Sequence, residues 1–272
     1  MGWLILGIVL SVTAVVLMSA KGWWSHRRKL ARIERDLVAM PALGGPNARK
    51  LDDLPASARK LLEHMIAPDA PPIRAVRFRL DGEIKPGKES GWLPIRSTEL
   101  LRVPGGFTWR AATGWPLKLA GGDHYFDNDG GVNFWLFGLL HIVKGRGKDV
   151  MRSARGRAAC EAMWFPPALL AAKWLPGDAP VCKLQLDGED YTLEFRIDEV
   201  GRIESVRGER WGDDTDDRSW AKLKFGADFT GEVSAEGYTI PSEFTAGWHH
   251  GTDEWEQGKF FRAKLTDVSW IE

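Results

Sequence analysis

The sequence predicts an α+β protein in which a curved, mostly antiparallel sheet, shaped as a half-barrel, wraps one kinked helix behind an N-terminal transmembrane helix. Three observations predict it. Residues 3–20 carry no charge, the apolar pattern beyond residue 73 repeats every two residues, and one helical segment interrupts the strands. Strands that follow one another without intervening helices pair antiparallel. With 272 residues, of which 44% are hydrophobic, the chain can bury a large core.

The balance of charge excludes some classes of function. The chain has 37 Lys and Arg against 37 Asp and Glu, whereas a nucleic-acid binder usually carries a basic domain. We therefore expect no nucleic-acid partner. The two cysteines, Cys160 and Cys182, are too few for a disulfide scaffold and form no paired metal-binding motif. We expect no cofactor and no metal.

The N-terminal segment predicts a transmembrane anchor over residues 1–20. A helix over the uncharged residues 3–20 spans roughly 27 Å, close to the ~30 Å hydrocarbon core of a bilayer. A cleaved signal peptide is the alternative, but Met18 is bulky where such a cleavage site needs a small residue. Trp3 at one end and Trp23 and Trp24 at the other fit interfacial aromatic belts.

Residues 21–46 predict a basic juxtamembrane helix and a hinge. Residues 29–40 have apolar side chains at helical spacing, so the anchor helix should continue through them as an amphipathic helix. The Pro- and Gly-rich segment 41–46 then breaks the pattern. Basic residues follow the anchor and none precedes it, so the positive-inside rule places the half-barrel-like globular domain, residues 47–272, on the cytoplasmic side of the cell (inner) membrane; the periplasmic side stays open. Contact with the bilayer surface is predicted for Lys21, Arg27, Arg28, Lys29 and Arg32.

The elements of the globular domain follow from its periodicity. A short helix is predicted over 55–66. Helical spacing returns only from about 148 to 173, where Pro166 and Pro167 kink the helix. Alternating segments predict strands at 73–80, 93–103, 107–113, 117–126, 132–137, 181–186, 191–197, 202–211, 221–229, 232–240, 243–249 and 260–270.

The predicted central helix carries a family resemblance. Arg157 lies four positions before Glu161, and the chain then reads Trp164-Phe-Pro-Pro-Ala-Leu-Leu170. This resembles the Arg-x-x-x-Glu and Trp-x-Pro-x-Ala-Leu-Leu signature of an uncharacterised bacterial, membrane-anchored family of unknown function. Further matching segments, such as Gly105-Gly-Phe-Thr-Trp109, extend the resemblance from about residue 50 to the C-terminus. The family's fold is similar to the half-barrel of lipoprotein carriers, which implies an apolar cavity.

Few polar residues form a pattern that predicts chemistry. Arg157 and Glu161 are one helical turn apart and predict either a structural ion pair or a polar pair at a cavity wall. Asp123, His124 and the other histidines lack the spacing of a metal site. The Asp-Asn-Asp-Gly run from residue 127 is typical of a turn. We therefore predict no catalytic residue.

Tryptophan is the most informative residue type. There are 14 tryptophans, and those beyond the N-terminal segment lie mostly in or beside predicted strands. They either fill the core or line a pocket for an apolar ligand. The candidate cavity residues are Trp109, Trp135, Trp164 and Trp248.

These observations together predict a membrane-anchored, non-catalytic module that binds a lipid or other apolar ligand at the membrane surface. One alternative is an enzyme that acts on a membrane-derived substrate with Glu161 or His124 as acid or base. Another is a scaffold that recruits a protein by strand addition. No particular protein partner is predicted.

Overall fold

The computed structural model describes residues 2–45, 51–115 and 117–272. Its helices are α1 (Gly2–Ala39), α2 (Ala56–Met65), α3 (Lys148–Cys160), α4 (Pro166–Ala171) and α5 (Trp255–Gly258), with 3-10 turns η1 (Leu51–Asp53) and η2 (Ala162–Trp164). Its strands are β1 (Ala75–Ile84), β2 (Leu93–Arg102), β3 (Gly106–Thr113), β4 (Leu119–Phe126), β5 (Asp129–Leu136), β6 (Leu140–Gly145), β7 (Lys173–Leu175), β8 (Val181–Leu186), β9 (Glu189–Ile197), β10 (Ile203–Gly212), β11 (Ala221–Ala235), β12 (Tyr238–Trp248) and β13 (Lys259–Ile271).

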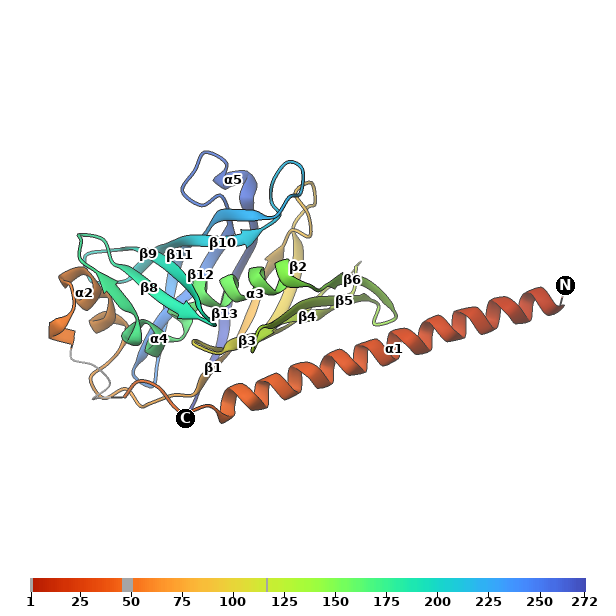
Figure 1. Cartoon of the computed structure of the whole chain (residues 1–272), viewed down its shortest axis with the longest axis horizontal. Helices are drawn as coiled ribbons and strands as arrows, with labels where there is room; N and C mark the ends of the chain where they lie inside the picture. Colours follow the sequence, from red (N-terminus) through yellow and green to blue (C-terminus); the bar gives the residue numbers. More distant parts are fainter. Residues whose placement is uncertain (1, 46–50, 116) are drawn as a thin grey trace.

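The strands of the described residues form one open, antiparallel sheet. Their order is β6-β5-β4-β3-β2-β1-β13-β12-β11-β10-β9-β8-β7, so β6 and β7 are the two edges. Helix α3 contacts β3, β4 and β5 from one half of the sheet and β8, β9 and β10 from the other. The sheet can touch one helix from both halves only because it curves around it (Figure 1). The predicted antiparallel sheet around a central helix is confirmed.

Alternation along each strand separates a concave face, which holds the core, from an outer face. In β1, Val76, Phe78 and Leu80 are buried while Arg77 and Arg79 are exposed. Successive side chains of a strand point to opposite faces of the sheet, so this pattern means that one face of β1 is buried and the other is exposed. The neighbouring strands alternate in the same way, and their inward-facing apolar side chains form one continuous core under α3.

The predicted elements were wrong in three regions of the chain. Residues 221–249 form two strands and not three, because the irregularity at Gly231 is a bulge and the real turn lies at Glu236 and Gly237, whose φ angles are 51° and 83°. The central helix ends at Cys160, before the prolines, and Pro166 opens α4, since proline suits a first helical turn. The edge strands β6 and β7 were missed because they are short or exposed and do not alternate clearly.

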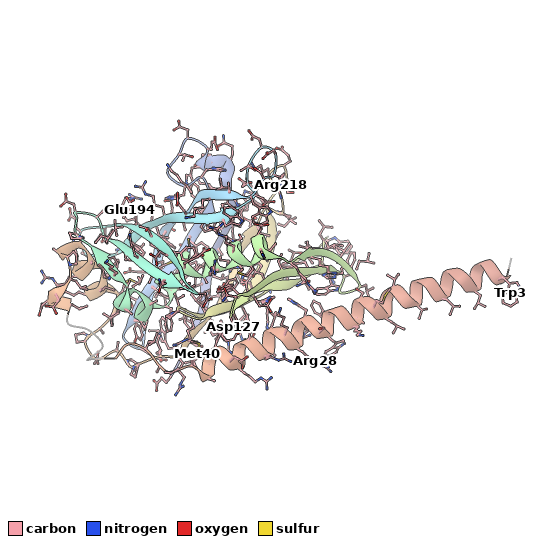
Figure 2. The ribbon with its side chains drawn as sticks, viewed as in Figure 1. Trp3, Arg28, Met40, Asp127, Glu194 and Arg218 are labelled. Carbon is pink, nitrogen blue, oxygen red and sulfur yellow. The ribbon has the colours of Figure 1, made fainter. Side chains whose placement is uncertain are left out.

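Helix α1 packs along the outer face of the sheet with its C-terminal half. Leu30, Ile33 and Leu37 are buried there, and Glu34 accepts a hydrogen bond from Arg110 Nε at 2.9 Å. The N-terminal half extends beyond the sheet (Figure 1), and Figure 2 shows Trp3 near its free end.

The predicted transmembrane anchor over residues 1–20 is not supported. Within the described ranges, no helix combines the length and apolarity that crossing a membrane requires. The uncharged residues are not a separate element, because α1 continues from them into its basic and packed residues without a break. Pro46 of the predicted hinge and the predicted domain start at residue 47 lie outside the described residues. The cytoplasmic location stays a prediction.

The basic residues of α1 do not all face solvent. Lys29 Nζ lies 2.5 Å from Asp129 Oδ2, so this side chain is directed to the sheet. The guanidinium of Arg27 lies over the rings of Trp23 and Trp24. Lys21, Arg28 and Arg32 are exposed, and contact of these residues with a membrane surface stays a prediction.

The contact between α1 and the sheet should depend on pH through His26. This side chain is 7% exposed, and burial beside His124 lowers its pKa to about 4. An unfolded histidine has a pKa near 6.5, so the unfolded state binds more protons as the pH falls from about 6.5 to 4. The free energy of unfolding is therefore undiminished by His26 above about pH 6.5, and it falls as the pH drops from there toward 4. Replacing His26→Gln should remove at most about 3 kcal/mol of this loss.

Thermal unfolding measured across this pH range tests the prediction. The wild-type protein should lose more stability toward pH 4 than the His26→Gln variant, because glutamine cannot take up a proton. Parallel profiles for the two proteins would show that His26 does not carry the effect.

Candidate functional site

A cavity of about 240 Å³ lies between the concave face of the sheet, α3 and η2. This is somewhat smaller than the 300–1,000 Å³ typical of sites for drug-sized ligands. Its aromatic lining comes from strands on both halves of the sheet and from η2: Trp109, Phe134, Trp164, Phe225, Phe244, Phe260 and Phe261. The curvature of the sheet therefore brings together rings that are far apart in sequence.

One arginine and three carboxyl groups form the polar part of the cavity wall. Arg157, on α3, has its Nε 2.7 Å from Glu161 Oε1, its Nη1 2.8 Å from Asp123 Oδ2 and its Nη2 2.7 Å from Glu99 Oε2. Cross-strand pairing of β2, β3 and β4 places Glu99, Trp109 and Asp123 in one row under the arginine. The guanidinium also lies over the Trp109 ring, 5.2 Å from its centroid.

The charges of this cluster balance when Glu99 holds a proton. Glu99 is 1% exposed, and burial, together with the neighbouring Glu161, raises its pKa well above the ordinary value. A second cation, Arg210, donates from Nε to the Ser153 carbonyl, and burial lowers its pKa to about 10. Arg157 and Arg210 then face two remaining carboxyl groups, of which Asp123 also has a pKa raised by burial, a shift that Arg157 opposes. A neutral cluster avoids most of the cost of an uncompensated buried charge.

Several polar atoms of the cavity wall have no hydrogen-bond partner among the described residues. They are Glu99 Oε1, Glu161 Oε2 and the indole nitrogen of Trp109. A proton on Glu99 can be shared with Glu161, since a hydrogen bond between these side chains contributes to the raised pKa of Glu99. A carboxylate oxygen that accepts this proton keeps a second lone pair that can accept from a ligand. The Trp109 N–H has no such solution within the described chain. Buried polar groups are normally paired, so these atoms mark the wall where a ligand group can bind.

The structure separates the four candidate tryptophans. Trp109 and Trp164 line the cavity. Trp248 packs against Phe225, with centroids 5.0 Å apart, and does not line it. Trp135 lies on the outer face of β5, where its ring stacks on His141 and contacts α1. Ligand binding by any of them stays a prediction, and Trp135 has no access to this cavity.

The predicted polar residues are also divided between faces. Arg157 and Glu161 lie together at the cavity wall. Asp123 joins them, whereas His124, the next residue on β4, points to α1 on the opposite face. His124 and Glu161 therefore cannot act on the same ligand. Among the described residues no group of three or more His, Cys, Asp or Glu side chains is arranged to hold a metal.

Sequence reasoning missed Glu99, Arg210 and the role of Asp123. Glu99 had a usable signal, because it occupies an inward position between Ser97 and Leu101 in an alternating strand, and a charge at such a position needs a partner. Nothing local indicated that the partner would be Arg157, which lies 58 residues away in sequence.

The fold and the site define a class of protein, an open antiparallel sheet that curves around a helix over a small apolar cavity with a buried charge cluster. Residues 45–260 match the family of unknown function DUF6544, and the chain belongs to this family. A comparison with curated proteins finds no match.

Two solved structures are similar to the chain. One is a domain from Vibrio parahaemolyticus described as an outer membrane lipoprotein-sorting protein domain, with 12% identity, a TM-score of 0.39, and coverage of 72% of this chain and 85% of that chain. The other is a LolA-superfamily protein from Nitrosomonas europaea, with 10% identity, a TM-score of 0.40, and coverage of 80% of this chain and 92% of that chain. At these scores the likeness carries no argument about function.

Proposed function

We propose that this protein is a non-catalytic module that binds one small, largely apolar ligand in the cavity between the sheet and α3. The observation that supports this proposal is the cavity itself, about 240 Å³ of aromatic-lined space between the concave face of the sheet and α3. Protein interiors are close-packed, and the few natural voids are rarely larger than a water molecule. A cavity of this size therefore favours a ligand over core packing alone.

The unpartnered atoms of the wall indicate the polar part of the ligand. The Trp109 N–H is a donor, and the Glu161 carboxylate oxygen is an acceptor. A group that both accepts and donates hydrogen bonds, such as a hydroxyl or an amide, satisfies both. Anionic ligands are disfavoured because all three carboxyl groups of the cluster already face Arg157. The second guanidinium of the cluster, Arg210, already donates to the Ser153 carbonyl.

An acid–base enzyme is the second candidate, and the raised pKa of Glu99 favours it. Two carboxyl groups whose proton affinities differ are a frequent arrangement for general acid and base catalysis. The two functions differ in one result. A ligand that is recovered chemically unchanged after long incubation supports the binding module, whereas turnover that Glu99→Gln abolishes supports the enzyme.

Replacing Ala246→Phe should block the ligand. Ala246 lines the cavity next to Phe244 and Phe261, so a phenyl ring at this position occupies the space without removing an existing contact. The full-length chain, purified gently, incubated with a total lipid extract and examined by native mass spectrometry, should retain a small bound molecule. The variant should retain at least about tenfold less, as the loss of 1.4 kcal/mol would produce.

Two further variants complete the test, one as a control for damage to the fold and one as a probe of the polar contact. Ala112→Phe places the same ring on the exposed outer side of β3 and should leave occupancy unchanged. Trp109→Phe removes the indole N–H but keeps a ring in the wall, and it should weaken binding of a hydrogen-bonding ligand. A bare wild-type protein after the incubation would contradict the proposal, as would equal occupancy in wild type and Ala246→Phe at equal melting temperature.

A further inference from the structure

A second hollow, of about 690 Å³, lies on the opposite face of the sheet between α1, β5, β6 and the start of α3. Four basic side chains line it: Lys29, Lys144, Arg146 and Lys148. Asp129 is the one acidic residue of its described lining, and its carboxylate is engaged by Lys29. The hollow therefore presents an excess of positive charge, and it is separated by the sheet from the cavity proposed to bind the apolar ligand.

The wall of this hollow contains hydrogen-bonding groups without partners. His124 is 2% exposed and lines the hollow, and neither of its ring nitrogens has a hydrogen-bond partner in the described chain. Its nearest carboxylate oxygen, on Asp129, is 3.8 Å away. His26 is 7% exposed and lines the same wall, where its Nε2 is likewise unpartnered among the described residues. These imidazoles can donate to an oxygen-rich group.

Helix α3 adds backbone donors to the same place. Its first residues follow Gly147, which makes no side-chain cap, and Gly147 and Lys148 both line the hollow. The amides of an uncapped first turn point out of the helix and favour an anion, as the helix dipole also does. Cationic side chains, imidazoles and helix amides together form the donor set that suits a phosphate group.

Exposed apolar side chains stand beside the hollow. The β5–β6 hairpin runs alongside α1 (Figure 1), and its tip exposes Phe137, Leu139 and Leu140, each about half accessible to solvent. Met18, which lines the hollow on α1, is 66% exposed. Exposed apolar side chains beside a basic site are typical of proteins that contact a membrane.

We propose that this hollow binds the phosphate of an anionic phospholipid at a bilayer surface, with the β5–β6 tip and the adjoining side of α1 against the acyl chains. The positive excess favours a headgroup with net negative charge. The apolar side chains beside it favour a lipid phosphate, because free phosphate has no acyl chain that could contact them. This assignment is independent of the ligand in the other cavity.

A fluorescent label at the hairpin tip tests the proposal on the full-length chain. Leu139→Cys, labelled with a polarity-sensitive dye, should shift its emission to shorter wavelength when phosphatidylglycerol-containing vesicles are added. Cys160 and Cys182 are buried, and burial raises the pKa of each thiol to about 12, so the new cysteine takes the label selectively. Val200→Cys, exposed far from the tip, is the control label and should show no shift.

The basic residues are tested in the labelled protein. Lys144→Gln with Lys148→Gln should raise the amount of anionic lipid needed for half of the shift by roughly 30-fold, which corresponds to about 1 kcal/mol for each lysine. Lys173→Gln with Lys183→Gln, a cross-strand pair at the opposite edge of the sheet, should leave it unchanged. A tip label that stays in water in the presence of vesicles would overturn the proposal. Equal effects of the two lysine pairs, or displacement of the tip from vesicles by millimolar inorganic phosphate alone, would also overturn it.

Discussion

Replacing Arg157→Met is expected to lower the free energy of unfolding by about 3 to 5 kcal/mol. Arg157 contacts Glu99, Asp123 and Glu161 at 2.7–2.8 Å, and each of these carboxyl groups is at least four-fifths buried. Without this guanidinium, the carboxyl groups lose all three of these contacts, and only Arg210 remains as a nearby cation to offset their burial. Equilibrium unfolding in urea at pH 7 measures the loss.

The pH dependence distinguishes this mechanism from a simple loss of packing. In the variant the carboxyl groups can escape the penalty by binding protons, so the difference from wild type should shrink as the pH falls. Arg196→Met removes an arginine from an exposed pair with Glu204, 3.0 Å apart, and should cost less than about 1 kcal/mol. A deficit for Arg157→Met that is equal at pH 5 and pH 7 would contradict the electrostatic account.

Replacing Trp164→Ala is expected to lower the free energy of unfolding by about 3 to 5 kcal/mol. The ring is 3% exposed and lies 4.9 Å from the Phe244 ring and 5.5 Å from the Phe78 ring, measured between centroids. Its Nε1 donates to the Pro241 carbonyl at 2.8 Å, and alanine removes this hydrogen bond. Because the substitution damages the core as well as the cavity wall, stability is the quantity to measure.

Two further substitutions separate the contributions of the ring. Trp164→Phe keeps most of the apolar contact and loses the hydrogen bond, so we expect a loss of about 1 to 2 kcal/mol. Trp115→Ala removes an indole that is 77% exposed and should change stability by less than about 0.5 kcal/mol. A loss below about 1 kcal/mol for Trp164→Ala would show that the interior collapses around the deleted side chain.

The charge cluster contributes to the argument for a ligand as well as to stability. Desolvating several ionisable groups offsets most of their attraction, so well-packed apolar residues of similar volume usually stabilise a core at least as well. In this protein the cluster lies in the wall of an apolar cavity and leaves Trp109 Nε1 and Glu161 Oε2 unpartnered among the described residues. We infer that it is suited to recognising the polar group of a ligand.

Local patterns were sufficient for most elements of the fold. Alternation of apolar and polar residues is a property of neighbouring positions, and it predicted the antiparallel sheet and the interrupting helix. It failed at β6, an exposed edge strand, and around Gly231, where a bulge looks like a turn. It also could not show that the long N-terminal helix, residues 2–39, packs on the sheet with its C-terminal half.

The candidate site divides in the same way. The sequence by itself determined that Arg157 and Glu161 share a helix face, because their spacing is one helical turn. Only the tertiary structure decided that Glu99 and Asp123 join them, that Trp135 faces α1, and that Asp123 and His124 lie on opposite sides of the sheet. Spacing determines which face of its own element a residue occupies, whereas the curvature of the sheet and the register of its strands determine which faces meet.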